Sequence, residues 1–255
     1  MSQPRRTLFI LAITGLLCLI YLWFFGTATM FALEARYVGW KLPEVKKTPG
    51  ELPDQSIAQV PGRKLTYFGY EFEIPWDIDE AKSKQVGQMQ LVAFRSGNAL
   101  VISRSAPKEF VTKFLQTNPV GMQALYGENI FQSDYSLKEM ILEVTPNKVG
   151  LLTSRKEAVG NAMLLLMKGI MMPRGGESGI YRIRTGDFRG FQFGDPRNRL
   201  RSLTVEIYDR DGGLGFIFAQ RENGAEPPIT QAEINRVIQS VRKSTNPNQK
   251  LAIIN

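Results

Sequence analysis

The sequence predicts an α+β protein, with a single N-terminal transmembrane helix followed by an antiparallel sheet packed with helices in an α/β sandwich. Three observations lead to this prediction. An uncharged, apolar stretch at residues 8–25 follows Arg5 and Arg6. Runs of alternating apolar and polar residues, typical of half-buried strands, occur within 65–102 and 180–220. Stretches with helical spacing separate and close these runs.

The apolar stretch predicts a retained signal anchor over residues 8–30. It lies at the short end of the roughly 20 residues that a membrane-spanning helix needs, and the uncharged sequence continues to Leu33. Tyr21 and Trp23 fall near its distal end, where amphipathic rings favour the headgroup level. A cleaved signal peptide is the alternative, because the small residues at 26–28 resemble a cleavage site.

The charges beside the anchor predict its orientation. Arg5 and Arg6 precede it, while Arg36 and Lys41 follow it, so the two sides carry equal numbers of nearby cations. The short tail of residues 1–7 also carries the N-terminal amine, and tails of this kind stay in the cytoplasm. We therefore predict a single-pass membrane protein with its globular domain on the extracytoplasmic, periplasmic side. The predicted partners are the lipid bilayer, through residues 8–30, and a membrane or envelope protein.

The rest of the chain divides by composition. Residues 31–62 predict a proline-containing linker, because proline fixes φ and disfavours helix before it. The first part of this linker, 36–41, interleaves aromatics with cations, which fits either contact with headgroups or a solvated stalk. Residues 63–244 predict one α+β domain, since about 180 residues make one sizeable core. Residues 245–255 predict a loose tail.

The first half of the domain predicts strands followed by short helices. Residues 65–75 alternate between apolar side chains and glutamates, which indicates a strand. Residues 91–94 and 99–102 flank Ser96-Gly97-Asn98, a good hairpin loop. Short helices are predicted at 107–115, 119–126 and 136–143.

The second half predicts a long helix, a meander and a closing helix. Ser154 and Glu157 form a possible capping box, which opens an apolar core helix that runs to about Met172. Thr230 and Glu233 form a second capping box, which opens the last helix. Between these helices, strands are predicted at 180–185, 188–193, 202–208 and 214–220.

Three segments of this domain resemble the PsbP-like fold. They are GYEFEIPW at 69–76, YDRDG at 208–212 before the strand at 216–218, and EINRVIQSV at 233–241. The fold is shared by photosystem extrinsic proteins, small bacterial lipoproteins and a nuclear import factor. The resemblance covers about residues 65–243 and implies a non-enzymatic accessory or binding domain, with no catalytic residues to carry over.

Composition excludes several chemistries. The chain has no histidine, so Ser-His-Asp and Cys-His catalysis and imidazole metal sites are excluded. The single cysteine, Cys18, lies in the anchor, so the predicted domain has neither a thiol nor a disulfide. An enzyme built from this chain would have to use Asp, Glu, Lys, Tyr or Ser. We predict no cofactor and no metal.

An arginine-rich segment is the best functional signal. Residues 174–201 hold seven arginines against three acidic residues. Alternation along the strand at 180–185 places two of these arginines on one face, and guanidinium forks match planar oxyanions. A solvated sheet face is the alternative interpretation. The predicted anion-binding residues are Arg182, Arg184, Arg199 and Arg201.

Other motifs have structural explanations that we prefer. The thioethers of Met163, Met167 and Met171 form one helical stripe that could hold copper(I), but such stripes are more often core filler. Residues 209–212 begin like a calcium loop but lack its later ligands, which favours a hairpin turn. The alternating carboxylates of Glu71 and Glu73 are more often a wet strand face than a catalytic pair.

We therefore predict a membrane-anchored extracytoplasmic accessory or binding module with no evident catalytic site, which binds an anionic ligand or partner through an arginine-rich sheet face. One alternative is a carboxylate-based hydrolase acting on cell-envelope polymers, and another is a structural subunit that packs on a membrane partner. Nucleic acid is not a predicted partner, because one segment with a net charge of +4 is a poor electrostatic footprint.

Overall fold

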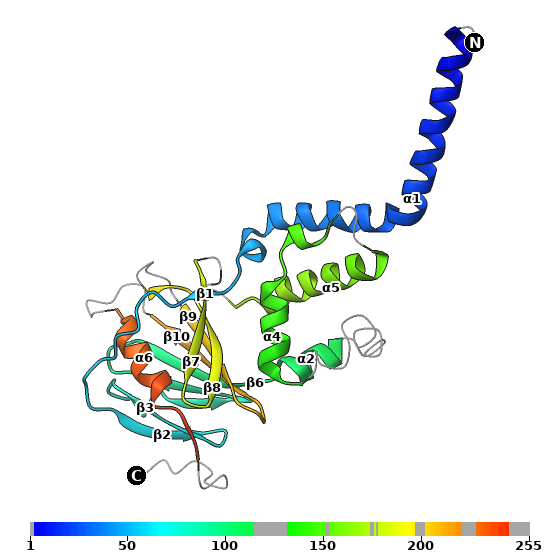
Figure 1. Cartoon of the computed structure of the whole chain (residues 1–255). Coiled ribbons are helices and arrows are strands. Elements are labelled where there is room, and N and C mark those ends of the chain that lie inside the picture. Colours follow the sequence, from blue (N-terminus) through cyan, green and yellow to red (C-terminus); the bar gives the residue numbers. More distant parts are fainter. Residues whose placement is uncertain are drawn as a thin grey trace.

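The computed structural model shows an α+β protein with a large sheet covered on both faces (Figure 1). It describes residues 3–114, 132–150, 154–173, 176, 178–196, 202–220 and 228–244. The α-helices are α1 (Gln3–Lys41), α2 (Pro107–Phe114), α4 (Asp134–Glu143), α5 (Arg155–Met171) and α6 (Gln231–Gln239), and the 3₁₀ helices are η1 (Pro43–Lys46) and η3 (Pro146–Lys148).

The main sheet has eight strands in the order β1-β7-β8-β9-β10-β6-β5-β4. All its pairs are antiparallel except β1–β7, which is parallel, so the sheet is mixed and not, as predicted, antiparallel throughout. Its strands are β1 (Gly50–Glu51), β4 (Lys84–Val86), β5 (Met89–Ala93), β6 (Ala99–Ser105), β7 (Ile180–Thr185), β8 (Phe188–Phe193), β9 (Ser202–Tyr208) and β10 (Gly213–Ala219). A second sheet has the order β11-β3-β2, with β2 (Arg63–Tyr67), β3 (Tyr70–Ile74) and β11 (Arg242–Lys243).

The first core lies between one face of the main sheet and a layer made of α6 and β3. Phe72 of β3 packs edge to face on Phe216 of β10, with ring centroids 5.2 Å apart. The capping box of α6 is confirmed, because the Thr230 hydroxyl accepts from the backbone of Glu233 while that glutamate accepts in return. The apolar face of α6 then closes this core through Ile234, Val237 and Ile238.

The opposite face of the sheet is covered by α4, and further helices pack beyond it. Phe191 and Phe193 of β8 contact α4 through Leu142 and Tyr135. A separate helical core joins α1, α2, α4 and α5. The sheet therefore sits between an α6 layer and a helical layer, and α1 leads away from the latter (Figure 1).

The C-terminal part of α1 belongs to the helical layer. Its small residues Ala28, Ala32 and Ala35 are buried, which lets α1 lie close against α5. A side chain at Gly39 would meet Cγ of Pro146 at 2.7 Å, so η3 also approaches α1 closely. The N-terminal part of α1 extends away from the domain (Figure 1).

The predicted fold class needs correction at the N-terminus. Within the part of the chain that the structure describes, no helix is long and apolar enough to cross a bilayer, which overturns the predicted transmembrane helix. Residues 31–41, which the sequence assigns to a linker, continue the helix instead. The physical reason is tertiary packing, because an alanine face here finds a partner in α5. The predicted localisation stays a prediction.

Most of the predicted strands and helices match the structure, but one predicted strand is a hairpin. The hairpin of β5 and β6 and the helices α2, α4 and α5 are confirmed. The strand predicted at 65–75 is a hairpin, because Phe68 and Gly69 adopt positive φ values of 56° and 83° and turn the chain. The helix predicted at 119–126 and the loose tail lie outside the described residues.

Candidate functional site

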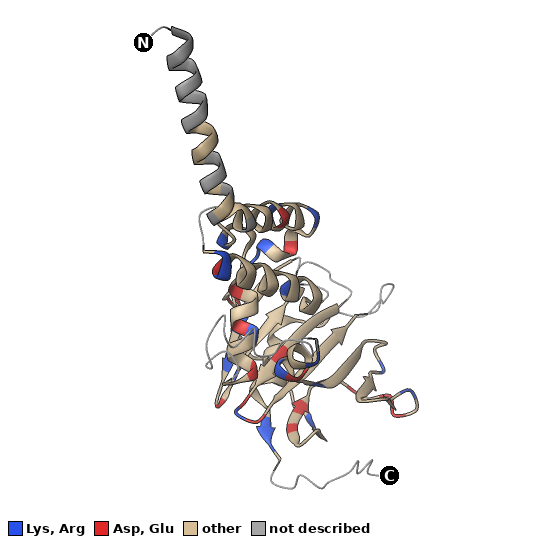
Figure 2. Ribbon diagram, turned by 90° about the vertical axis from the view of Figure 1, so that its right-hand side faces the viewer, with Lys and Arg blue, Asp and Glu red and all other residues tan. Residues whose placement is uncertain are grey.

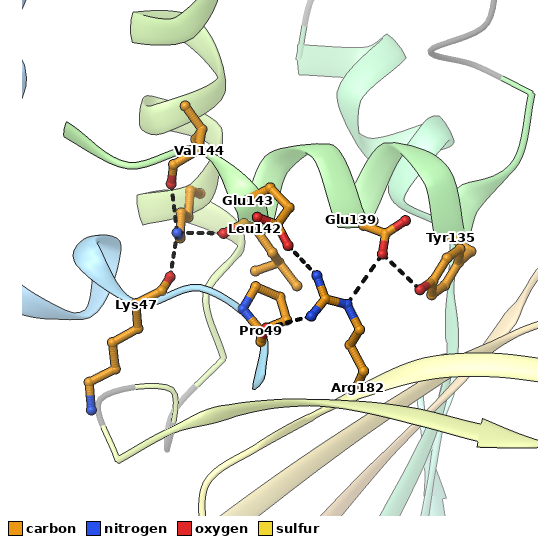
Figure 3. A network of polar contacts seen from close by, with 9 residues as sticks. Lys47, Pro49, Tyr135, Glu139, Leu142, Glu143, Val144 and Arg182 are labelled. Atoms are coloured by element: carbon orange, nitrogen blue, oxygen red, sulfur yellow. Dashed lines mark hydrogen bonds and ion pairs between the residues drawn. The ribbon is translucent and has the colours of Figure 1, made fainter. Parts of the chain in front are cut away.

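Arg182 of β7 lies at the junction of the sheet, α4 and the chain after α1. Its guanidinium forms an ion pair with Glu143, contacts Glu139 at 3.4 Å, and donates to the Pro49 carbonyl at 2.6 Å. Figure 3 shows the guanidinium between the two carboxylates. These neighbours raise the pKa of Arg182 against the effect of burial. The guanidinium nitrogens of Arg182 are therefore all directed at acceptors within the protein, and they hold β7 against α4.

Tyr135 extends this network toward the end of β8. Its hydroxyl donates to Glu139 at 3.0 Å, and burial together with this carboxylate raises its pKa to about 12. Its ring stacks on Phe191 with an interplanar angle of 5°. The guanidinium carbon of Arg189 lies 5.9 Å from the centre of the same ring. The Tyr135 ring therefore lies beside the guanidinium of Arg189, whose side chain is exposed to solvent.

Arg184 and Arg189 face each other across the β7–β8 hairpin. Gly186, with φ of 51°, helps form its two-residue turn, and the resulting register places Arg184 directly opposite Arg189. Both side chains are exposed. Among the described residues, neither guanidinium forms an ion pair, although Asp187 lies in the adjoining turn. Two like charges in directly opposite positions destabilise a sheet unless an anion lies between them.

The structure brings together only part of the predicted arginine set. Arg182 and Arg184 share the α4 face of β7, as the alternation predicts, but only Arg184 is free of carboxylates. Arg199 and Arg201 lie outside the described residues. Arg189 was not in the predicted set. Its position opposite Arg184 could have been found, because a two-residue turn at 186–187 fixes the register.

A buried lysine supports the same junction from the helical side. Lys168 of α5 is fully buried, and its ammonium donates to the carbonyls of Lys47 at 2.6 Å, Leu142 at 2.6 Å and Val144 at 2.7 Å. Figure 3 labels these three acceptors. Two of these carbonyls belong to the C-terminal end of α4, where a cation is favourable. Lys168 and Arg182 together hold both α4 and the segment between α1 and β1.

A second buried network lies under α2 and α4. The Lys138 ammonium pairs with Glu206 at 2.8 Å, and the Tyr208 hydroxyl donates to the same carboxylate at 2.7 Å. Burial, followed by the charge of this glutamate, raises the pKa of Tyr208 well above 10. Because the phenol proton is committed to Glu206, the Ser105 hydroxyl must be the donor to Tyr208. The network is internally satisfied and borders an open hollow of about 240 Å³.

The other sequence candidates have structural partners. Glu71 and Glu73 line a pocket of about 380 Å³, but Glu73 pairs with Arg236 at 2.6 Å and Glu71 accepts from Ser244 at 3.0 Å. The Asp209 carboxylate accepts from two backbone N–H groups of its own hairpin turn. The predicted thioether stripe packs in the helical core through Met163, Met167 and Met171.

No family model, curated protein or solved structure matches the chain. The resemblance to the PsbP-like fold therefore stays a prediction.

Proposed function

We propose that this protein is a non-catalytic accessory module that binds an oxyanion group of a partner between Arg184 and Arg189. The observation that carries the proposal is the directly opposed, exposed arginine pair without a carboxylate partner among the described residues. The other arginine of this sheet face, Arg182, has its carboxylates in place. Unlike Arg182, the pair keeps its donors available for an external acceptor.

The chemistry of the pair fits carboxylate or phosphate. Each guanidinium presents donors in a planar fork, and two forks on neighbouring strands can hold two oxygens of one group. The Tyr135 ring restricts Arg189 on one side, which lowers the entropy lost on binding. Arg182 holds the strand from which Arg184 projects, so the first fork stands on a fixed backbone.

Binding needs fewer assumptions than catalysis in this chain. The absence of histidine excludes the common nucleophilic dyads and triads. The carboxylates that a hydrolase would need, Glu71 and Glu73, already accept from Ser244 and Arg236. An arginine pair at the end of a hairpin, in contrast, needs no further group in order to recognise an anion.

The test is a titration of the full-length chain in zwitterionic detergent with inorganic phosphate and, separately, with citrate. The side-chain Nε–H signals of arginine, followed by NMR, should shift for the pair at millimolar ligand. Replacing both residues (Arg184→Gln, Arg189→Gln) should weaken binding at least about tenfold, since a charge-assisted pair is worth about 1.5–3 kcal/mol.

The matched control is Arg210→Gln with Arg95→Gln, because both arginines are exposed in other turns and this double variant loses the same two charges. This variant should bind both anions like the parent chain. An equal loss in the control would show only a diffuse charge effect and would refute the site. Unshifted signals from Arg184 and Arg189 would refute it as well.

A further inference from the structure

The outer face of α1 exposes large apolar and aromatic side chains. Their spacing of seven, three, four and three residues repeats once per two helical turns, so they lie along one side of the helix. The exposed fractions are 86% for Trp23, 50% for Met30, 58% for Leu33, 60% for Tyr37 and 69% for Trp40.

The opposite side of the helix fixes this orientation. Ala28, Ala32 and Ala35 are at most 4% exposed, and the last two pack in the helical core. Gly39 continues the small-residue side and meets η3. If α1 rotated so that its aromatic side faced the domain, the tryptophan and tyrosine rings would have to fit into the space that the alanine methyl groups now fill. The outer face therefore cannot be covered by the domain itself.

Cations accompany the aromatic rings on this face. The Lys41 ammonium lies 4.4 Å from the Trp40 ring centre and 5.8 Å from that of Tyr37. Arg36 is exposed beside them (Figure 2 shows basic and acidic residues on this part of α1). Between Trp23 and Lys41 the exposed charged side chains are Arg36 and Lys41 against Glu34. The face is thus both amphipathic and net positive.

We propose that the outer face of α1, from Trp23 to Lys41, docks on the surface of an anionic lipid bilayer. Tryptophan and tyrosine favour the headgroup region because their rings are apolar at one end and polar at the other. Lysine and arginine reach past such rings to anionic headgroups. An apolar protein partner would leave these cations without counterions, whereas an anionic headgroup layer supplies them. This inference does not depend on the arginine pair.

The test follows one tryptophan in the full-length chain. The variant Trp23→Phe, Trp76→Phe keeps only Trp40, and it is mixed with vesicles that contain phosphatidylglycerol and lipids brominated near the headgroup. We expect a blue shift and strong quenching of Trp40. The companion variant Trp23→Phe, Trp40→Phe keeps Trp76, which packs on Phe94 in the sheet core and should not be quenched.

Vesicle association alone is no test, because it does not show which part of the chain contacts the lipid. The position of Trp40 is the decisive readout. Arg36→Gln with Lys41→Gln should lower the fraction of quenched Trp40 in vesicles, because the docking equilibrium of this face should weaken roughly 30-fold if each cation contributes independently. The control Lys64→Gln with Arg242→Gln removes equal charge from the α6 side of the domain.

Three results would overturn the proposal. The first is vesicle-bound protein with unquenched Trp40. The second is equal quenching in vesicles of neutral phosphatidylcholine, which would remove the anionic requirement. The third is a blue-shifted Trp40 in a stable dimer without lipid, which would show that a second copy covers the face. Circular dichroism of each variant verifies that it folds.

Discussion

At the scale of single residues, buried charges mark where the layers are joined. Lys168 is the clearest case, because its ammonium supplies donors to three carbonyls from two separate segments. Replacement by methionine keeps the side-chain length but leaves these carbonyls without their donor. We expect Lys168→Met to lower the free energy of unfolding by about 3 kcal/mol, measured by urea denaturation. An unchanged midpoint would show that water replaces the ammonium at no cost.

The protonation of Lys168 gives a pH dependence with a defined sign. Burial lowers its pKa to about 8, from an ordinary value of 10.5, with Glu143 opposing the shift. Between these values the unfolded chain binds more protons, so stability rises with pH in this window and the contribution is flat below it. The gain is at most about 3 kcal/mol. Unfolding measured from pH 7.5 to 10 should show this rise in the parent chain but not in Lys168→Met.

Gly190 lies where the backbones of β8 and β9 approach each other closely. A methyl group at Gly190 would collide with the Glu206 carbonyl oxygen and lie 2.9 Å from Cα of Ile207. We expect Gly190→Ala to destabilise the protein by about 3 kcal/mol, because β8 and β9 would have to separate. Gly215→Ala is the control, since its methyl would meet the Ser103 hydroxyl at 3.2 Å and the Ser103 carbonyl oxygen only at 3.7 Å, an ordinary contact distance. Similar losses for the two variants would contradict this explanation.

At the scale of elements, α1 shows how one helix serves two surfaces. Ala32 is completely buried against the helical core, whereas Leu33 is 58% exposed on the outer face. Ala32→Leu should destabilise the protein by about 1–3 kcal/mol through overpacking. Leu33→Ala should change the free energy of unfolding by less than about 0.5 kcal/mol. Thermal melts of both variants in detergent check this contrast, and a reversed order would mean that the two faces are misassigned.

Elements with local signals could be predicted from sequence alone. The N-cap at Ser154 and the capping box at Thr230 define the starts of α5 and α6, and alternation defines β9 and β10. The sequence did not separate β2 from β3, because their turn contains Phe68, a residue that rarely adopts positive φ. It also misassigned residues 31–41 to a linker, because the prolines from Pro43 onward argue against a helix before them, whereas packing against α5 keeps this part of α1 helical.

At the scale of the whole molecule, ion pairs join the helical layer to the sheet: Arg182 of β7 with Glu143 of α4, and Lys138 of α4 with Glu206 of β9. Arg182→Gln removes the contacts among β7, Glu143 and the Pro49 carbonyl. We expect the layers to unfold at different temperatures, with Trp40 reporting the helical layer and Trp76 the sheet in single-tryptophan chains. Arg182→Lys keeps the positive charge but loses the planar guanidinium, so the two unfolding temperatures should differ less than in Arg182→Gln. Coincident melts of both reporters in Arg182→Gln would show that the layers are coupled elsewhere.

By itself, the sequence determined the α+β class, the order of most elements and the excluded chemistries, because these depend on local periodicity, caps and composition. It also pointed to an arginine-rich strand. Only the tertiary structure decided which arginines are available, since Glu139 and Glu143 come from a distant helix and saturate Arg182. The same holds for α1. Periodicity shows that a segment is apolar, but long-range packing decides which face is buried and which is left for a partner.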